Sequence, residues 1–357
     1  MKVKIFVLMC ILLITGCVSP KVIDELPVVF VVGYDSGENK KMKATVASQV
    51  FNRDQSSSIY TYTASSHTSK GLRNQLSAIQ KPITIGKIAV ILFSEEMASE
   101  DKGITRILDS YLRDATVGRL VTIAIVEGGS AHDLVKYDYG YPEGLGPHIK
   151  NLINKSVEFS NFPRTNLHLY DYMYKGAGMD PYVPIINKKG NKIQLTGLAL
   201  FKNDKMVEKL NLEETFVFNL MNEKANIGVH ELKVNHSGYA SLQQVSSNVK
   251  YRIENHKSVP TIYINISVKG SISEYSGLQI NTKVEHMIQK ALERKIESKG
   301  RKLVGKFQNL KIDPLCIGDR VRSQTRQFNV ANWNQIYPTT KIVVKANVHI
   351  SGSGVVR

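Results

Sequence analysis

The chain has 357 residues, of which 42% are hydrophobic and 22% charged, and its formal net charge is +16. At this length we expect two or three domains, each with its own hydrophobic core. Three cysteines are too few for a disulfide framework, and no apolar stretch after the first twenty residues approaches the length of a transmembrane helix, so both classes are excluded for that part of the chain.

The first residues have the order of a signal peptide. Lys2 and Lys4 precede an apolar run from Ile5 to Ile14. A hydrocarbon core of roughly 30 Å requires about 20 apolar residues, so this run is too short to remain as a spanning anchor. We predict that residues 1–16 are removed.

The segment that closes this run, Leu13-Ile14-Thr15-Gly16-Cys17, resembles the bacterial lipobox. In that motif the cysteine thiol is diacylated, with chains such as palmitate, and two or three chains give stable membrane anchoring. We therefore predict lipidation at Cys17 and a polar spacer over 17–26. A plain secreted protein with an accidental cysteine is the alternative.

The cysteines agree with this prediction. Cys10 is lost with the leader and Cys17 carries lipid, which leaves Cys316 alone in the mature chain. No internal disulfide can then form.

Residues 27–190 read as an N-terminal mixed α/β domain. An apolar run at Val28–Val32, turn residues over Gly33–Asn39 and alternation over Lys41–Val50 predict a β-hairpin. Residues Asn52–Ser69, rich in Ser and Thr, are expected to form a surface loop. Further elements are predicted as a helix from Thr68 to Ile79, a strand at Lys87–Phe93, a helix at Asp101–Asp114, a strand at Leu120–Val126 and a short helix at Ser130–Tyr137.

A domain boundary is predicted near Asn187–Thr196, and residues 191–357 form an α+β region with two subdomains as an option, 191–255 and 256–357. A strand at Gln194–Lys202 enters a hairpin whose tip is Asn203-Asp204. A helix is expected around Leu212–Met221.

The last hundred residues have the clearest pattern. Thr261–Lys269 and Lys341–Ile350 alternate apolar and polar residues, which predicts two strands, each with one buried face. Between them, Thr282–Lys299 has one apolar face and reads as a helix that stops at Gly300. Antiparallel strands with a packed amphipathic helix are expected, so the fold class is α+β or mixed α/β and multidomain, with mixed and antiparallel sheets.

No catalytic or metal-binding motif is present. The nine histidines are scattered without HExxH or paired metal spacing, and His132-Asp133 lies in a predicted helix where adjacent side chains diverge. We expect no catalytic residue, no cofactor and no metal. Cys316, beside Gly318, is expected to be structural, and the histidines are His67, His132, His148, His168, His230, His236, His256, His286 and His349.

Three short segments could bind an anion or act as an acid. Gly128-Gly129-Ser130, between a strand and a helix, could cradle an anion, although a plain turn with Ser130 as N-cap is the favoured alternative. Glu95-Glu96 and Glu213-Glu214 are interpreted as charges that complement helix N-termini.

Much of the positive charge lies late in the chain. From Tyr251 to Arg357 there are 18 Lys or Arg against 7 Asp or Glu, a balance of +11. The simplest partner is an anionic membrane surface, at about 1 kcal/mol per basic residue near the headgroups. A solvated surface without a partner is the alternative. Nucleic acid is excluded, because the chain is exported and no zinc-ligand or aromatic RNA-binding pattern appears.

Four stretches, in order, carry a resemblance to a known family. They are the lipobox with Ile23-Asp24-Glu25-Leu26 and Val32-Gly33-Tyr34-Asp35; Ile88–Glu96 followed by Ile107–Asp114; Thr196–Lys205 with Leu210, Glu213 and Glu214; and Asp313–Arg322 followed by Trp333 and Tyr337-Pro338. Together they resemble the Ger(x)C family of spore germination lipoproteins, the C subunits of germinant receptors in endospore-forming bacteria. Leu315-Cys316 stands where the family has Phe-Gly, Tyr337 where it has Phe, and Gly86-Lys87 where a His is common.

The resemblance implies a three-domain α/β lipoprotein at the outer face of the spore inner membrane, in complex with the germinant receptor A and B membrane subunits. It also implies that nutrients trigger this complex and that the C subunit is needed for the response.

The leading hypothesis is a non-catalytic scaffold or coupling subunit. Trp333 is its candidate exposed aromatic residue, with a core tryptophan as the alternative. A second hypothesis is a solute-binding lipoprotein that captures a nutrient for a membrane transporter. A membrane-attached hydrolase is disfavoured, because no motif assembles a site.

Overall fold

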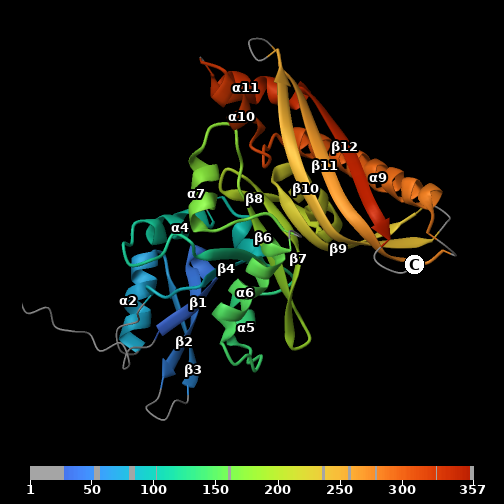
Figure 1. Cartoon of the computed structure of the whole chain (residues 1–357). Coiled ribbons are helices and arrows are strands. Elements are labelled where there is room, and N and C mark those ends of the chain that lie inside the picture. Colours follow the sequence, from blue (N-terminus) through green and yellow to red (C-terminus); the bar gives the residue numbers. More distant parts are fainter. Residues whose placement is uncertain are drawn as a thin grey trace, which may run out of the picture.

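The computed structural model describes residues 28–51, 57–79, 85–101, 103–159, 162–234, 238–255, 259–277, 280–326 and 328–353. Within these ranges the chain forms two β-sheets with helices packed against them (Figure 1). This architecture confirms the predicted fold class. The predicted leader, Cys17 and the spacer to residue 26 lie outside the described residues.

The larger sheet has eight strands in the order β3-β2-β1-β4-β5-β6-β7-β8. Its centre, from β1 through β4 and β5 to β6, is parallel, and antiparallel strands extend it at both ends. Because helices cover both faces, β4 and β5 are buried along their whole length. The strands are β1 (Val28–Ser36), β2 (Met42–Phe51), β3 (Ser57–Ser66), β4 (Val90–Ser94), β5 (Thr122–Val126), β6 (Tyr182–Lys189), β7 (Lys192–Lys202) and β8 (Lys205–Asn211).

Helices separate onto the two faces of this sheet. One face packs against the apolar stripes of α2 (Ser69–Ile79), α4 (Thr105–Leu112) and α7 (Leu167–Lys175). The other packs against α5 (Ala131–Lys136) and α6 (Leu145–Glu158). A 3-10 turn, η2 (Glu38–Lys40), joins β1 to β2, and the short α3 (Glu95–Ala98) follows β4 directly.

The smaller sheet has four strands in the order β12-β11-β10-β9, namely β9 (Ala225–Lys233), β10 (Tyr239–Glu254), β11 (Thr261–Tyr275) and β12 (Lys341–Ser353). The long α9 (Thr282–Leu310) lies along one face (Figure 1). There it covers the alternate buried side chains of β11, which are Ile262, Ile264, Ile266 and Val268. α8 (Leu212–Asn222) contacts both sheets as well as α9, and α10 (Ile317–Gln324), α11 (Val330–Ile336) and η4 (Tyr337–Thr339) lead from α9 to β12.

The prediction that the last two strands are antiparallel is wrong. β11 and β12 pair in parallel, with Ile264 opposite Val344. The reason is α9, whose 29 residues extend for about 44 Å and return the chain along the sheet, so β12 starts at the same end as β11.

The predicted helix stop at Gly300 is also wrong, since α9 continues to Leu310 and ends at Lys311, which has a positive φ of 53°. Gly300 is buried inside the helix, and a Cβ there would lie 2.9 Å from Val344 Cγ1. This glycine therefore serves close packing of α9 on β12.

The surface loop expected at Asn52–Ser69 is a third error. Residues 57–66 form β3, which pairs with β2 over its length, for example Thr63 with Thr45. Tyr62 and the buried Ala64 face inward, so the Ser-rich composition conceals a strand with β-branched and aromatic residues at alternate positions.

The predicted boundary near Asn187–Thr196 falls at the turn between β6 and β7, and these two strands pair within one sheet. The division into domains at residue 190 stays a prediction. No helix among the described residues has the length and apolar character needed to cross a membrane.

Candidate functional site

Asp35, at the end of β1, holds the N-terminus of α5. Its Oδ1 accepts a hydrogen bond from the N–H of Ala131 at 2.7 Å, and its Oδ2 accepts one from the N–H of His132 at 2.8 Å. These N–H groups have no partner within the helix and favour negative charge. Ser130 is the N-cap, as predicted. The donors that an anion cradle at Gly128–Ser130 would offer to a ligand are therefore occupied by the chain's own carboxylate.

Gly33, two residues before Asp35, lets α5 approach the sheet. A Cβ at Gly33 would lie 3.0 Å from the carbonyl oxygen of Ala131. Tyr34 points to the opposite face, where its hydroxyl lies 2.6 Å from that of Tyr111. Burial raises the pKa of Tyr34 to about 12, so this hydroxyl pair is neutral at ordinary pH. The Gly-x-Asp segment thus docks helices on both faces of β1.

An ion-pair cluster closes the carboxyl ends of β4 and β5, the edge at which open α/β sheets usually bind ligands. Lys209 Nζ lies 2.7 Å from Glu95 Oε1 and 2.7 Å from Glu127 Oε1. The hydrogen bond from Lys209 lowers the pKa of Glu127, so the carboxylate is ionised. Glu95 and Glu96 also lie in the first turn of α3, in the position predicted.

Glu213 and Glu214 lie in the first turn of α8, also as predicted, and tie this helix to α9. Glu213 is 3.0 Å from Lys295 Nζ and 2.7 Å from Lys299 Nζ. Glu214 is 3.0 Å from Lys306 Nζ and completes a capping box with Asn211. These carboxylates hold helices together.

Two buried aspartates connect the loop before β6 with the start of α10. The N–H of Asp313 donates to Asp180 Oδ2 at 2.7 Å, and the N–H of Asp180 donates to the carbonyl oxygen of Asp313 at 3.0 Å. The Asp313 carboxylate accepts from the N–H groups of Ile317 at 2.9 Å and Gly318 at 2.7 Å. Burial raises the pKa of Asp313 to about 7, although these two N–H bonds act in the opposite direction.

Beside these two aspartates, the backbones at Gly178 and Gly318 are in close contact. Gly178 has a φ of +74°, and a Cβ on it would lie 2.7 Å from Gly318 Cα. Trp333 packs against Gly318 and is only 2% exposed, so it is a core residue and not an exposed contact. We call the contact made by Gly178, Asp180, Asp313 and Gly318 the aspartate joint.

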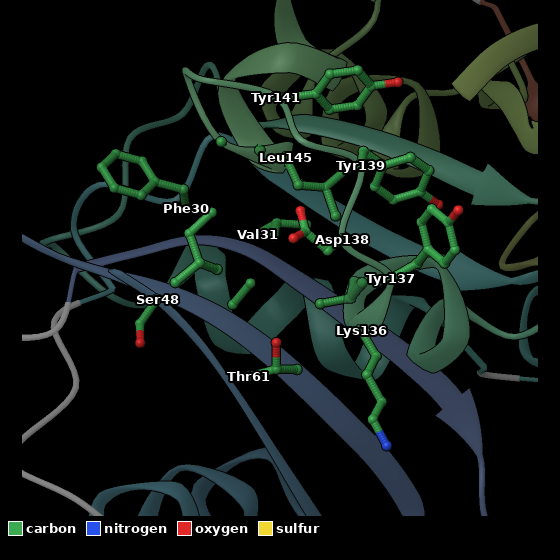
Figure 2. Close-up of a pocket in the computed structure, with 15 residues that line it drawn as sticks. Phe30, Val31, Ser48, Thr61, Lys136, Tyr137, Asp138, Tyr139, Tyr141 and Leu145 are labelled. Carbon is green, nitrogen blue, oxygen red and sulfur yellow. The ribbon is translucent and has the colours of Figure 1, made fainter. Parts of the chain in front are cut away.

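A pocket of about 340 Å³ opens beside the start of β1, between the first three strands and the loop from α5 to α6. In Figure 2, Phe30 lies on one side, Tyr137 and Tyr139 lie on the other, and Asp138 lies between them. The Tyr139 ring stacks on Tyr141 at 5.3 Å. Its hydroxyl is buried and has no hydrogen-bond partner among the described residues. The tyrosines come from the Gly- and Pro-rich segment after Lys136, where no site was predicted.

The remaining candidate residues have local partners or lie apart from one another, so they do not form a common site. His132 Nδ1 lies 2.8 Å from Thr45 Oγ1, and His148 Nδ1 lies 2.9 Å from Glu143 Oε1. Burial raises the pKa of Cys316 to about 12, which keeps the thiol protonated. Across the described part of the chain, no three His, Cys, Asp or Glu side chains converge to hold a metal ion. Cys17, the predicted lipidation site, lies outside it.

Two family profiles together match most of the chain. The profile described as spore germination protein N-terminal domain matches residues 19–188, and that described as spore germination B3/GerAC like, C-terminal, matches residues 196–354.

Individual relatives agree with these profiles. The chain is 29% identical over 358 residues to the spore germination protein GerQC of Bacillus cereus, with 98% of both chains covered. It is 27% identical over 380 residues to the putative spore germination protein YfkR of Bacillus subtilis (strain 168), with 98% of this chain and 95% of the relative covered. The crystal structure of the GerBC protein has the same fold, with a TM-score of 0.57, 17% identity, and coverage of 89% of this chain and 96% of that one.

Proposed function

The chain belongs to the Ger(x)C family of spore germination proteins, the C subunits of germinant receptors, and from this premise we propose that it is a lipid-anchored, non-catalytic subunit of a nutrient germinant receptor. In this proposal Cys17 carries the lipid at the outer face of the spore inner membrane. The chain there acts as a scaffold or coupling subunit for the receptor A and B membrane subunits.

The observation that carries the scaffold proposal is the aspartate joint. It unites residues from the two family segments, 19–188 and 196–354, through Asp180 and Asp313. Both side chains are nearly inaccessible, at 6% and 4% exposed. A body whose halves are fixed in this way presents a constant arrangement of surfaces to its partners, which is what a scaffold requires.

The use of the polar residues supports a non-catalytic role. Asp35 binds the start of α5, Asp313 binds the start of α10, and Lys209 pairs with two carboxylates at the carboxyl edge of the sheet. Groups with these partners hold secondary structure in place and are not poised to react with a substrate.

The lipid anchor is tested by Cys17→Ala in the natural spore-former. We expect the variant protein to leave the membrane fraction of dormant spores on washing with high salt and the germination response to fall, because the acyl chains supply the attachment that salt does not weaken. Cys10→Ala, in the apolar run of the leader, is the matched control and should change neither. Retention of Cys17→Ala in membranes washed with high salt, or an unmodified Cys17 thiol in the mass spectrum of the mature N-terminal peptide, contradicts the proposal.

The partner assignment is tested by co-purification. A tagged chain extracted from dormant-spore membranes in mild detergent should bring down the A and B subunits of one receptor. Recovery of the chain without either subunit would contradict the coupling role.

The tyrosine pocket favours a second candidate, a solute-binding lipoprotein. Its volume of about 340 Å³ suits a small molecule, and the Tyr137 and Tyr139 rings and Asp138 line it. Calorimetry with pooled amino acids and nucleosides should then give saturable heat that Tyr139→Ala, which removes a ring from the wall of the pocket, weakens. Tyr239→Ala, on an exposed tyrosine elsewhere, is the control. Absence of saturable heat would remove this candidate.

A further inference from the structure

One face of the four-stranded sheet is turned away from α9, and no helix of the described part of the chain packs on it (Figure 1). We call it the outer face. Strand pairing arranges fifteen of its residues in five rows across β10, β11 and β12. The rows are Glu254-Thr261-Lys341, Arg252-Tyr263-Val343, Lys250-Asn265-Lys345, Asn248-Ser267-Asn347 and Ser246-Lys269-His349.

The charge of the outer face is strongly one-sided. The fifteen residues of these rows include five basic residues, all exposed, against one carboxylate, so the net charge of the rows is +4 with neutral His349. The carboxylate, Glu254, lies 3.3 Å from Arg252. Within the described ranges, the other four basic residues make no ion pair, and they are Lys250, Lys269, Lys341 and Lys345.

On the opposite side of the same sheet, several lysines are held in ion pairs. Lys295, Lys299 and Lys306 of α9 are each within 3.0 Å of a carboxylate of α8. These three cations hold α9 to α8 and are paired, whereas the four lysines of the rows are available to solvent or a partner. Cross-strand neighbours of Lys250 and Lys345 include Asn265, which separates the two charges by one strand and limits their repulsion.

The chemistry of the outer face favours a lipid surface over a protein. Protein interfaces have aromatic or aliphatic anchors at their centre and are depleted in lysine. In these five rows the only large apolar or aromatic side chains are Tyr263 and Val343, and both are half-buried in the sheet. A broad lysine-rich surface instead matches the diffuse negative charge of phospholipid headgroups, which attract basic residues within about 8 Å at physiological salt.

We propose that the outer face lies against the anionic phospholipid headgroups of the membrane and so orients the chain on the bilayer. The proposal rests on the proposed lipid tether only for proximity. Ten residues separate Cys17 from Val28, and an extended segment of that length reaches at most about 35 Å. The tether would supply attachment, and the outer face would select which side of the protein meets the membrane.

A vesicle assay with unacylated protein tests the outer face alone. The chain from residue 17 onward, with Cys17→Ser, is floated with vesicles of phosphatidylcholine mixed with phosphatidylglycerol, and with vesicles of phosphatidylcholine alone. We expect binding to the anionic vesicles only, and a loss of binding as salt rises. Because this protein has no lipid, the result does not depend on whether Cys17 is acylated in spores.

Charge reversal locates the binding face. Lys250→Glu with Lys345→Glu should lower the partition coefficient by at least about 25-fold, since each basic residue near an anionic surface contributes roughly a fivefold factor. Arg294→Glu with Lys302→Glu, on the exposed side of α9, gives the same net charge and should retain most of the binding. Circular dichroism confirms that both variants fold.

Three outcomes would overturn the proposal. They are equal loss in the two double variants, equal binding to neutral vesicles, and no binding of the parent chain to either. If the parent chain binds no vesicles while Lys250→Glu with Lys345→Glu abolishes co-purification of the receptor subunits, the outer face docks on an acidic protein and the lipid assignment is wrong. Failure of the tether appears separately, as retention of the Cys17→Ala protein in spore membranes that have been washed with high salt.

Discussion

Glu297 of α9 accepts a hydrogen bond from the backbone N–H of Ala346 on β12, with Oε1 and N 3.1 Å apart. Glu293, one helical turn earlier, accepts one from the N–H of Val348 at 3.1 Å. The spacings agree, because four helical residues rise about 6 Å and two strand residues about 6.6 Å. β12 is an edge strand, so these glutamates cover N–H groups that could otherwise pair with another chain.

Removing both glutamates should therefore promote self-association. Glu293→Ala with Glu297→Ala leaves the middle of the β12 edge open, and we expect a concentration-dependent shift toward dimers or larger species in sedimentation velocity. Stability should fall by about 1 kcal/mol for each lost bond. Glu158→Ala with Glu274→Ala removes the same charge from exposed positions and should stay monomeric. Equal behaviour of the two pairs would show that the edge is not protected by these side chains.

Asp35→Ala should destabilise the chain. It leaves the buried N–H groups of Ala131 and His132 without an acceptor, which costs about 1–3 kcal/mol. Urea denaturation followed by circular dichroism measures the change. Asp109→Ala, which breaks only an exposed pair with Arg113, should cost less than about 0.5 kcal/mol. A cost for Asp35→Ala no larger than that of Asp109→Ala would contradict its role as the anchor of α5.

Gly318→Ala should weaken the aspartate joint. The added Cβ would lie 2.6 Å from Gly178 Cα, and backbone cannot move aside as a flexible side chain can. We expect a lower Tm and faster proteolysis near the loop before β6. Gly305→Ala in α9 meets open space, and it should raise stability by up to about 1 kcal/mol because alanine favours helix. Unchanged stability of Gly318→Ala would mean that the two backbones of the aspartate joint can move apart without a loss of stability.

The buried carboxyl of Asp313 gives stability a defined dependence on pH. Its folded pKa of about 7 lies above the value of about 3.9 for an unfolded aspartate, so the folded state binds more protons between these values. The contribution of Asp313 to stability is therefore fully present below about pH 4 and is lost as pH rises to about 7.

Asp313→Asn isolates this contribution. The difference in unfolding free energy between the parent chain and the variant should shrink from pH 5 to pH 7.5, while the effects of all other groups cancel. Chemical denaturation at both pH values measures it. A difference that is constant, or that grows with pH, would show that the N–H groups of Ile317 and Gly318 keep the carboxyl ionised throughout.

Patterns local in sequence predicted a large part of the fold. The β1–β2 hairpin, the β7–β8 hairpin with its Asn203 tip, and the starts of α5 and α8 depend on neighbours a few residues apart, and the structure confirms each. Alternation along β11 and β12 identified their buried faces for the same reason. The strands β6, β9 and β10 and the helices α6, α7, α10 and α11 were not predicted, because mixed or short patterns obscured them.

The candidate site shows the same division. The Gly-x-Asp segment at Gly33–Asp35 and the Asp-Pro segment at Asp313 could be found in the sequence, but their partners could not. Asp35 binds residues 96 and 97 positions later, and Asp313 binds Asp180, 133 positions earlier. Sequence periodicity does not indicate contacts at such separations, so the partners of these aspartates could not be predicted from the sequence.

By itself, the sequence determined the family, the charge balance and the elements whose hydrogen bonds close within a few residues, because those depend on side chains that are neighbours along the chain. Only the tertiary structure decided that β12 runs parallel to β11, that Gly300 packs inside α9 and that five basic residues of β10, β11 and β12 share one face of the sheet. These features depend on which surfaces, far apart in the sequence, pack together most favourably when the whole chain folds.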